Sequence, residues 1–255
     1  MFSESINLLD LSQDISNHDY WHQGRMILIK KEMDWTSFDL VNKCKISLKY
    51  GIGLKKIKLG HAGTLDPKAS GLMLLLAGKY TKLTDQIHLY NKTYEGSFYL
   101  GATTPCYDTE RPIDHYFPTE HINELLILNA ASQFVGEISQ TPPIFSAVKI
   151  NGKSAYKSAH KGKEIATRPR QITIHSFEIT RLDLPFVYFK VICSSGTYIR
   201  SLAHDFGKAL KSGAYLASLN RTGIGPWNLH QAVSVQQFLE KVNQYRIITK
   251  PNMAV

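Results

Sequence analysis

The chain has 255 residues, of which 43% are apolar and 20% charged, an ordinary balance for a folded protein that can bury a full core. It carries 30 basic and 21 acidic residues, and the formal net charge of +9 favours a polyanionic partner such as a nucleic acid. Cys44, Cys106 and Cys193 are isolated, which excludes a disulfide framework and a CxxC metal site. We find neither a signal peptide nor an apolar run of about 20 residues, and therefore expect a cytoplasmic protein without a membrane span.

The pattern of apolar residues predicts interleaved helices and strands. We expect an irregular arm over residues 1–24 and a strand at Arg25–Lys31. The segment Thr36–Asp39 resembles a capping box, which would open a helix whose face carries Leu40, Cys44 and Leu48. Further along, the pattern predicts a short strand at 57–60, a buried apolar run at 72–77, a helix at 79–90 and a strand at 93–100. A helical stretch should open at Thr119, with an apolar face of Leu125, Leu126, Leu128 and Phe134. After it we expect a hairpin around 145–152, strands near 172–181 and 186–194, a helix at 197–210, a strand at 215–222 and a helix at 235–242.

This order has no internal repeat, low-complexity tract or Pro/Gly-rich linker that would separate two domains. Strands and helices alternate irregularly, and hairpins interrupt them. The fold class that this pattern predicts is α+β (mixed α/β) in a single domain, and not a parallel doubly wound sheet.

Basic residues gather in two segments. The stretch 43–58 holds six lysines and no acid. The stretch 149–170 holds one acid, Glu164, among the basic residues Lys149, Lys153, Lys157, Lys161, Lys163, Arg168 and Arg170. Tyrosines and a histidine that could stack on bases lie among them, so we expect these segments to contact a phosphate backbone.

The segment Gly60–Gly71, read as GHAGTLDPKASG, places Asp66 on a turn bracketed by glycines and followed by Pro67. A buried run of apolar residues comes directly after this turn. A carboxylate on a tight loop next to a core strand is well placed for chemistry. Other readings of the chain are weaker: Gly51-Ile52-Gly53 lacks the further residues of a nucleotide-binding loop, His18 and His22 lack the context of a metal pair, and Ser194-Ser195-Gly196 is no hydrolase elbow.

Five islands in order carry a resemblance to a known family. They read GHAGTLDPxASG, KTYEG, PPxFSAxKxNGKxAY, SSGTYIRSLAxDxG and LNRTxxG. The chain thereby resembles the TruB-type tRNA pseudouridine synthases over roughly residues 25–240. The resemblance implies a pseudouridine synthase fold with a central, mostly antiparallel sheet flanked by helices. It also implies a catalytic domain at 25–242 with an RNA-gripping insertion at about 143–171.

The activity implied by the resemblance is isomerisation of uridine 55 in the T loop of tRNA to pseudouridine. The C1′–N1 bond of a flipped-out base is broken and a C1′–C5 bond is formed, which needs neither cofactor nor metal. Asp66 would be the catalytic carboxylate, acting in its ionised form either as a nucleophile or as a base at the 2′ carbon. Arg200 matches the arginine that pairs with this aspartate in the family.

Four further positions match family residues around the target base. Tyr94 would stack on the uracil and shuttle the C5 proton, while Tyr198 and Leu219 would line the uracil pocket. His61 would enter the RNA loop beside the flipped nucleotide and fill the gap that it leaves.

The chain departs from the family pattern in two places. Where the family usually reads KPxGxTS, this chain has KEMDWTS from Lys31 to Ser37, which puts the local turn and the role of Lys31 in doubt. After Val242 we expect only a tail at 243–255 and no PUA domain. We therefore expect a monomer that grips the T arm of tRNA through its basic segments without an obligatory protein partner. The alternatives are a tRNA-binding or folding protein with secondary or lost catalysis, and a synthase acting on another RNA.

Overall fold

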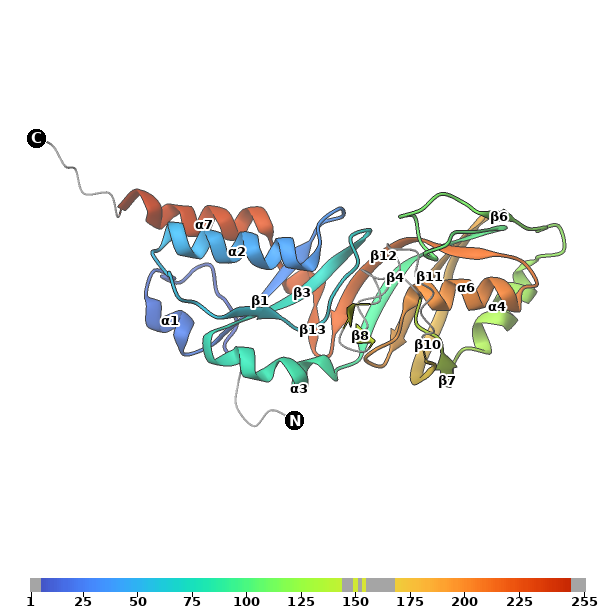
Figure 1. Cartoon of the computed structure of the whole chain (residues 1–255), viewed down its shortest axis with the longest axis horizontal. Coiled ribbons are helices and arrows are strands. Elements are labelled where there is room, and N and C mark those ends of the chain that lie inside the picture. Colours follow the sequence, from blue (N-terminus) through green and yellow to red (C-terminus); the bar gives the residue numbers. More distant parts are fainter. Residues whose placement is uncertain (1–5, 144–148, 151–152, 155–167, 249–255) are drawn as a thin grey trace, which may run out of the picture. The chain divides into compact units, whose positions relative to one another are not determined.

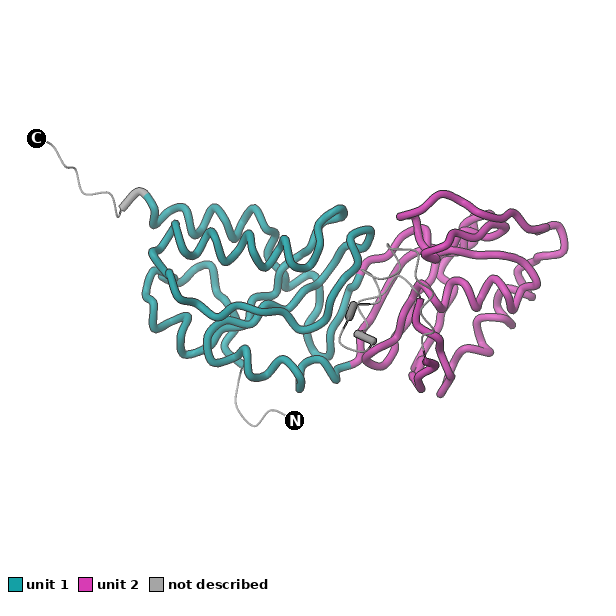
Figure 2. The backbone as a smooth tube through the Cα atoms, viewed as in Figure 1, with its two compact units in different colours: residues 1–90, 221–255 teal, residues 91–220 magenta. Residues whose placement is uncertain are grey.

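The structure is a computed structural model that describes residues 6–143, 149–150, 153–154 and 168–248. The chain forms two compact units, one of residues 1–90 with 221–255 and one of residues 91–220 (Figure 2). No composition shift or linker in the sequence marks this division. The catalytic domain expected over residues 25–242 includes parts of both units, and its limits stay a prediction.

The sheet of unit 1 has the strand order β14-β1-β3-β12, with β2 also paired to β3 (Figure 1). β1 (Arg25–Lys31) and β3 (Ala69–Ala77) run antiparallel, in a register that extends from Arg25↔Ala77 to Lys31↔Gly71. The remaining strands are short: β2 (Leu59–His61) is antiparallel to β3, β14 (Val233–Ser234) is parallel to β1, and β13 (Trp227–Asn228) forms a hairpin with the end of β12 (Ala214–Ile224). The predicted strand at 25–31 and the buried run at 72–77 are confirmed.

Helix α2 (Ser37–Gly51) begins at the predicted capping box. The Asp39 backbone N–H donates to the Thr36 hydroxyl at 3.0 Å, and the Thr36 N–H donates to the Asp39 carboxylate at 3.0 Å. α2 packs against α7 (Val235–Ile248) on one face of the sheet (Figure 1). α7 continues past the predicted end at Val242, so the first part of the expected C-terminal tail is helical.

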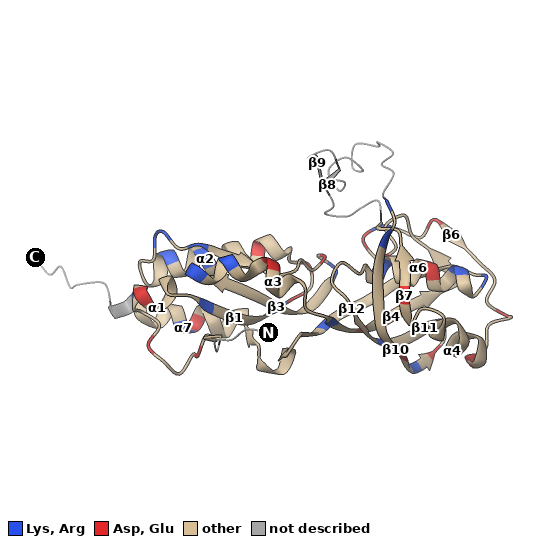
Figure 3. Cartoon of the chain, turned by 90° about the horizontal axis from the view of Figure 1, so that it is seen from below, with Lys and Arg blue, Asp and Glu red and all other residues tan. Residues whose placement is uncertain are grey.

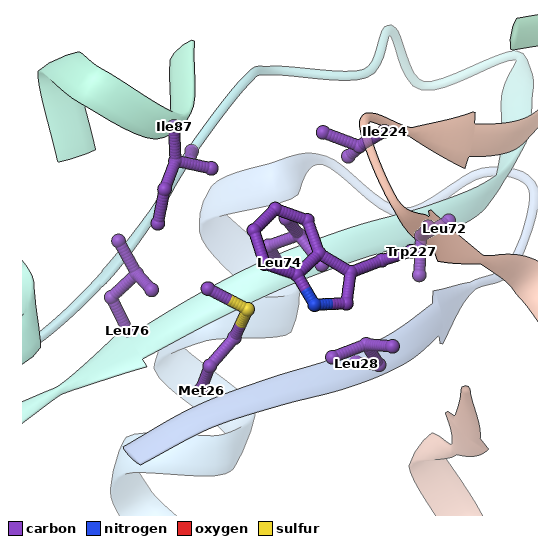
Figure 4. Close-up of a cluster of buried hydrophobic side chains, with 9 residues drawn as sticks. Met26, Leu28, Leu72, Leu74, Leu76, Ile87, Ile224 and Trp227 are labelled. Atoms are coloured by element: carbon purple, nitrogen blue, oxygen red, sulfur yellow. The ribbon is translucent and has the colours of Figure 1, made fainter. Parts of the chain in front are cut away.

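The other face of the unit 1 sheet buries an apolar cluster around Trp227 (Figure 4). Alternate residues of β1 and β3 point into it, as the two-residue period of a strand requires. Ile87 closes the cluster from helix α3 (Thr84–His88). Its members are Met26, Leu28, Ala62, Leu72, Leu74, Leu76, Ile87, Ile224 and Trp227.

Two expectations for unit 1 are wrong. The N-terminal arm is not irregular throughout, because α1 (His18–His22) forms within it and the fully buried Trp21 donates from Nε1 to the Ile15 carbonyl at 2.8 Å. The single helix expected at 79–90 is a 3₁₀ helix, η1 (Gly78–Leu83), followed by α3. The Thr81 and Thr84 hydroxyls each donate to the carbonyl three residues before them, at 2.8 Å, which suits the tighter 3₁₀ turn. A second 3₁₀ turn, η2 (Leu229–Gln231), precedes β14.

The sheet of unit 2 has the order β12-β4-β11-β10-β7. β4 (Lys92–Leu100), β11 (Phe186–Cys193), β10 (Arg170–Asp183) and β7 (Gly136–Gln140) are antiparallel to one another along this order. Helices α4 (Glu124–Ser132) and α6 (Ile199–Ala209) pack with it, and a ring cluster of Phe98, Phe177, Phe189 and Phe206 fills the core. A short pair, β5 (Ala102–Thr103) and β6 (His115–Tyr116), lies apart from the main sheet.

The helix expected from Thr119 is wrong in both its start and its face. α4 begins after the N-cap Asn123, and it buries Ile127, Ala130 and Ala131. The predicted core leucines are exposed instead, at 67%, 42% and 44% for Leu125, Leu126 and Leu128. The segment is apolar all around, so periodicity could not choose its buried side. Of the hairpin expected around 145–152, the antiparallel pair of β8 (Lys149–Ile150) and β9 (Lys153–Ser154) is confirmed, while residues 145–148 and 151–152 lie outside the described residues.

These features confirm a mixed α/β (α+β) fold with a mostly antiparallel sheet flanked by helices. Antiparallel pairs dominate, and β14 alongside β1 makes the sheet mixed. In the part of the chain that the structure describes, no helix is long and apolar enough to cross a membrane.

Candidate active site

Asp66 lies on the turn between β2 and β3 of unit 1. The two strands pair antiparallel, from Leu59↔Ala77 to His61↔Leu75, and the loop that carries Asp66 connects them. The Ala69 N–H donates to the Asp66 carbonyl at 3.1 Å and closes the turn. Leu65 is buried, while Asp66 is only half-buried. The predicted placement of a carboxylate on a tight loop beside a core strand is confirmed.

Arg221 of β12 holds the backbone before and after Asp66. Its guanidinium is 1% exposed and donates to three carbonyl oxygens: those of Gly63 at 3.0 Å, Thr64 at 3.3 Å and Leu72 at 2.8 Å. Gly63 has φ of +96°, a left-handed conformation that only glycine adopts readily. A buried arginine thus fixes the shape of the loop that carries Asp66.

Lys31, the last residue of β1, places a second buried cation beside this loop. Its side chain is fully buried, and Nζ donates to the carbonyls of Trp35 at 2.7 Å, Glu32 at 2.9 Å and Pro67 at 3.3 Å. Burial lowers the pKa of Lys31 to about 8; the charges of Asp66 and Asp34 act to raise this pKa, and Arg221 acts to lower it. The departure KEMDWTS therefore keeps a buried lysine coupled electrostatically to Asp66.

Ser37, at the first turn of α2, holds the residue directly before Asp66. Its hydroxyl donates to the Leu65 carbonyl at 3.0 Å and accepts from the Leu65 N–H at 2.9 Å. His61 lies half-buried at the end of β2. Burial, and next the Arg221 guanidinium, lower the pKa of His61, so its imidazole is neutral near pH 7. Its role as a wedge in the RNA stays a prediction.

The expected residues of the uracil pocket belong to unit 2. Tyr94 lies on β4 opposite Val191 of β11 and is 8% exposed. Leu219 lies on β12 and is half-buried, so it is not part of the sealed core. The neighbouring Ser218 is joined to Ser97 of β4 by a hydroxyl–hydroxyl hydrogen bond of 2.7 Å.

Tyr198 is the N-cap of α6, and Gln140 of β7 holds its backbone at both ends. The Tyr198 N–H donates to Gln140 Oε1 at 2.8 Å, and Gln140 Nε2 donates to the Tyr198 carbonyl at 3.1 Å. Gln140 is 1% exposed. The Arg170 guanidinium lies over the Tyr198 ring, 5.6 Å from its centre. Arg170, predicted to bind RNA, is thereby placed against a predicted pocket residue.

Arg200 follows in the first turn of α6 and is 4% exposed. Its Nε lies 3.5 Å from a carboxylate oxygen of the equally buried Asp108, and Nη1 donates to the Cys106 carbonyl at 3.3 Å. The pairing with Asp66 expected from the resemblance would join residues of different units, and it stays a prediction.

A family model described as TruB family pseudouridylate synthase (N terminal domain) matches residues 50–199, more than half of the chain. The chain belongs to the TruB family. A relative from Flavobacterium johnsoniae named tRNA pseudouridine synthase B is 52% identical over 221 residues, which cover 86% of this chain and 96% of the relative. A relative of the same name from Phocaeicola vulgatus is 44% identical over 225 residues, 88% of this chain and 96% of the relative.

The TruB-family chain also resembles a solved structure described as the crystal structure of a Cbf5-Nop10-Gar1 complex. The identity is 26% and the TM-score 0.65, over 89% of this chain and 61% of the solved one. This chain thus spans less than two thirds of the solved chain. The likeness agrees with the pseudouridine synthase fold expected from the sequence.

The basic residues predicted to bind RNA are only partly described. Lys149 and Lys153 lie on the β8–β9 hairpin, Arg168 is exposed and Arg170 is half-buried at the start of β10. Lys157, Lys161 and Lys163 lie outside the described residues. Among the residues that are described, no three His, Cys, Asp or Glu side chains gather as a metal site would require.

Sequence reasoning missed four residues that build the two parts of the candidate site. Arg221 stood inside a motif island without a role, and Lys31 was left in doubt because its motif is altered. Asp108 and Gln140 were not singled out at all. The only signal in the sequence was a charged or amide side chain beside an apolar strand. This signal could not show which groups these side chains bind, because most of their partners lie far away in the sequence.

Proposed function

We propose that this chain is a tRNA pseudouridine synthase that isomerises uridine 55 in the T loop. The observation that carries the proposal is the Asp66 loop, anchored by the buried cations Lys31 and Arg221, in a TruB-family chain. The relatives named tRNA pseudouridine synthase B, at 52% and 44% identity, support tRNA as the substrate.

The chemistry assigned to Asp66 is that of an ionised carboxylate. Acting on the nucleoside as a nucleophile, or removing a proton at the 2′ carbon, it allows the C1′–N1 bond to break while the uracil stays bound. The base then turns and C5 bonds to C1′. On the nucleophile route the bond between Asp66 and the nucleoside breaks in this step, and on the base route the 2′ carbon regains its proton. The proton on C5 is then removed and N1 gains a proton. Reactant and product are isomers, so no co-substrate is consumed.

Side chains around the base would supply orientation and proton transfer. Tyr94 offers a ring for stacking and a hydroxyl for the proton on C5. Tyr198 and Leu219 would bound the uracil, and His61 would fill the space that the base leaves. Arg200, held by Asp108, would present its guanidinium to a carboxylate.

We further propose that the chain acts on the T arm in the cytoplasm, as a monomer and without a protein partner. The net charge of +9 and the six lysines of residues 43–58 support direct binding to tRNA.

Release of tritium from an unmodified tRNA transcript labelled at C5 of uridine tests the activity and the position together. The purified chain alone should release one tritium per tRNA, and a transcript with cytidine at position 55 should release none. Binding without release would favour the alternative of a tRNA-binding or folding protein. Release that persists without uridine 55 would point to another site or another RNA.

A further inference from the structure

The turn between β1 and α2 keeps a left-handed residue where the family pattern has glycine. Asp34 has φ of +64°. A left-handed conformation is unfavourable for most residues that carry a side chain, and aspartate is one of the few that occasionally adopt it. The backbone at Asp34 thus has a conformation that glycine adopts readily, and the residue adds a carboxylate that glycine could not provide.

Asp34 uses both its backbone and its side chain to hold the Asp66 loop. Its N–H donates to the Pro67 carbonyl at 2.9 Å. Its carboxylate accepts from Lys68 Nζ at 2.7 Å, forming an ion pair. These contacts fix the first and second residues after Asp66.

The residues that flank this turn add further contacts on both sides of Asp66. Ser37 makes two hydrogen bonds to the backbone of Leu65, directly before Asp66, and Lys31 donates to the carbonyl of Pro67, directly after it. Of these contacts to the loop, only the pair Asp34–Lys68 is substantially exposed, at 66% and 38% of its side chains. An exposed ion pair contributes little to folding stability. A small displacement of a reacting group, in contrast, is costly for the rate.

We propose that Asp34 and Lys68 are positioning residues for the isomerisation: their ion pair latches the Asp66 turn to the β1–α2 turn and so sets where the catalytic carboxylate stands. This proposal rests on the proposed function. It assigns a role to the altered motif of this chain, in which Asp34 replaces the glycine and Lys68 follows the aspartate-proline pair.

The charge of Asp34 adds an independent readout. Lys31 is surrounded by Asp66 and Asp34, which favour its proton, and by Arg221, which disfavours it. Neutralising Asp34 removes one of the two favourable charges. Any fall in activity that accompanies loss of the Lys31 proton should therefore begin at lower pH in Asp34→Asn than in the wild type.

The test is a double-mutant cycle of Asp34→Asn and Lys68→Met, measured as multiple-turnover pseudouridine formation over a series of tRNA concentrations, which gives kcat and KM separately. Asparagine keeps the size of the side chain and its tolerance of positive φ. Each single variant should slow the reaction about fivefold with KM within about twofold, and the double variant should be no slower than either single one. Asp34→Gly is the matched control for the backbone: it should be as slow as Asp34→Asn and at least as thermally stable as the wild type.

Three results would overturn the latch. These are unchanged rates, losses that add fully in the double variant, or a rise in KM with unchanged turnover, which would make Lys68 an RNA contact. A slow Asp34→Gly that also unfolds at lower temperature would indicate a purely structural turn. The wild type serves as the separate check of the proposed function, since a wild type without product refutes that function and leaves no rate to compare.

Discussion

The Asp66 carboxylate stands on a loop that two buried cations organise through backbone carbonyls. Arg221 binds the loop before Asp66 and the strand after it, while Lys31 binds the carbonyl of Pro67. Replacing either cation by an apolar residue would leave the backbone carbonyl groups that it binds without this donor. The position of the loop thus depends on hydrogen bonds from two buried cations to its backbone.

Lys31 leads to a prediction about stability and pH. It releases its proton near pH 8 in the folded chain and at its ordinary value of 10.5 when unfolded. Between these values the unfolded chain holds more protons, so the contribution of Lys31 to stability rises with pH. From about pH 7.5 to about pH 9.5, the free energy of unfolding of the wild type should gain ~2 kcal/mol relative to Lys31→Met. Denaturant titrations at both pH values measure this change, and a constant difference between the proteins would contradict it.

At the scale of elements, Gln140, the last residue of β7, binds the backbone of Tyr198, the residue that precedes the first turn of α6. The Tyr198 side chain makes no capping hydrogen bond to the first turn of α6, and the Tyr198 N–H donates to Gln140 Oε1. Gln140→Leu should lower the free energy of unfolding by about 1–2 kcal/mol, because two backbone groups lose their partner. Gln140→Leu should also slow pseudouridine formation, because Gln140 holds the start of α6, which carries Tyr198 and Arg200.

Gln140→Glu is the control for this prediction, since burial favours its protonated form, which keeps an acceptor for the Tyr198 N–H and an O–H donor for the Tyr198 carbonyl. Chemical denaturation and single-turnover rates should place it between the wild type and Gln140→Leu. If Gln140→Leu matched the wild type in both measurements, the two hydrogen bonds between Gln140 and Tyr198 would have no role in stability or catalysis.

Helix α2 and the loop after it carry the basic surface of unit 1. Leu40, Cys44 and Leu48 face the core, as the sequence predicts, and the lysines Lys43, Lys45, Lys49, Lys55, Lys56 and Lys58 are exposed (Figure 3). The double variant Lys45→Gln/Lys49→Gln should weaken tRNA binding and reduce the slope of log K against log salt by about 2. Filter binding across a salt series measures both quantities.

The matched control removes the same charge from the opposite face of the unit 1 sheet. Lys79 and Lys82 are exposed on η1, which lies across the sheet from α2 (Figure 1). The variant Lys79→Gln/Lys82→Gln should leave the salt slope within error of the wild type. Equal losses in the two double variants would mean that net charge, and not the α2 surface, drives binding.

Local signals in the sequence predicted the elements well where they were strong. The capping box placed α2, and the apolar runs placed β1 and β3. The buried face of α4 was mispredicted because leucine surrounds the helix, and the 79–90 helix was divided by threonine side chains that bond to the backbone. The role of Arg221 could not be predicted, because its partners at Gly63, Thr64 and Leu72 become neighbours only when the end of β12 joins the unit 1 sheet.

At the scale of the whole molecule, the family motifs are distributed over both compact units. Asp66 and His61 belong to unit 1, and Tyr94, Tyr198 and Arg200 belong to unit 2. The resemblance assigned these residues to one reaction from sequence order alone. The structure adds how each group is held within its own unit: by Lys31 and Arg221 around Asp66, and by Asp108 and Gln140 at the start of α6.

We propose that Asp66 performs the chemistry and is not needed to hold the RNA. Single-turnover conversion of a tRNA transcript by Asp66→Asn, with its affinity measured in parallel, tests this claim most directly. We expect the affinity of Asp66→Asn to lie within about threefold of that of the wild type and its rate to be at least ~1,000-fold lower, because a neutral amide can be neither the nucleophile nor the base. Conversion at a rate near that of the wild type would contradict it.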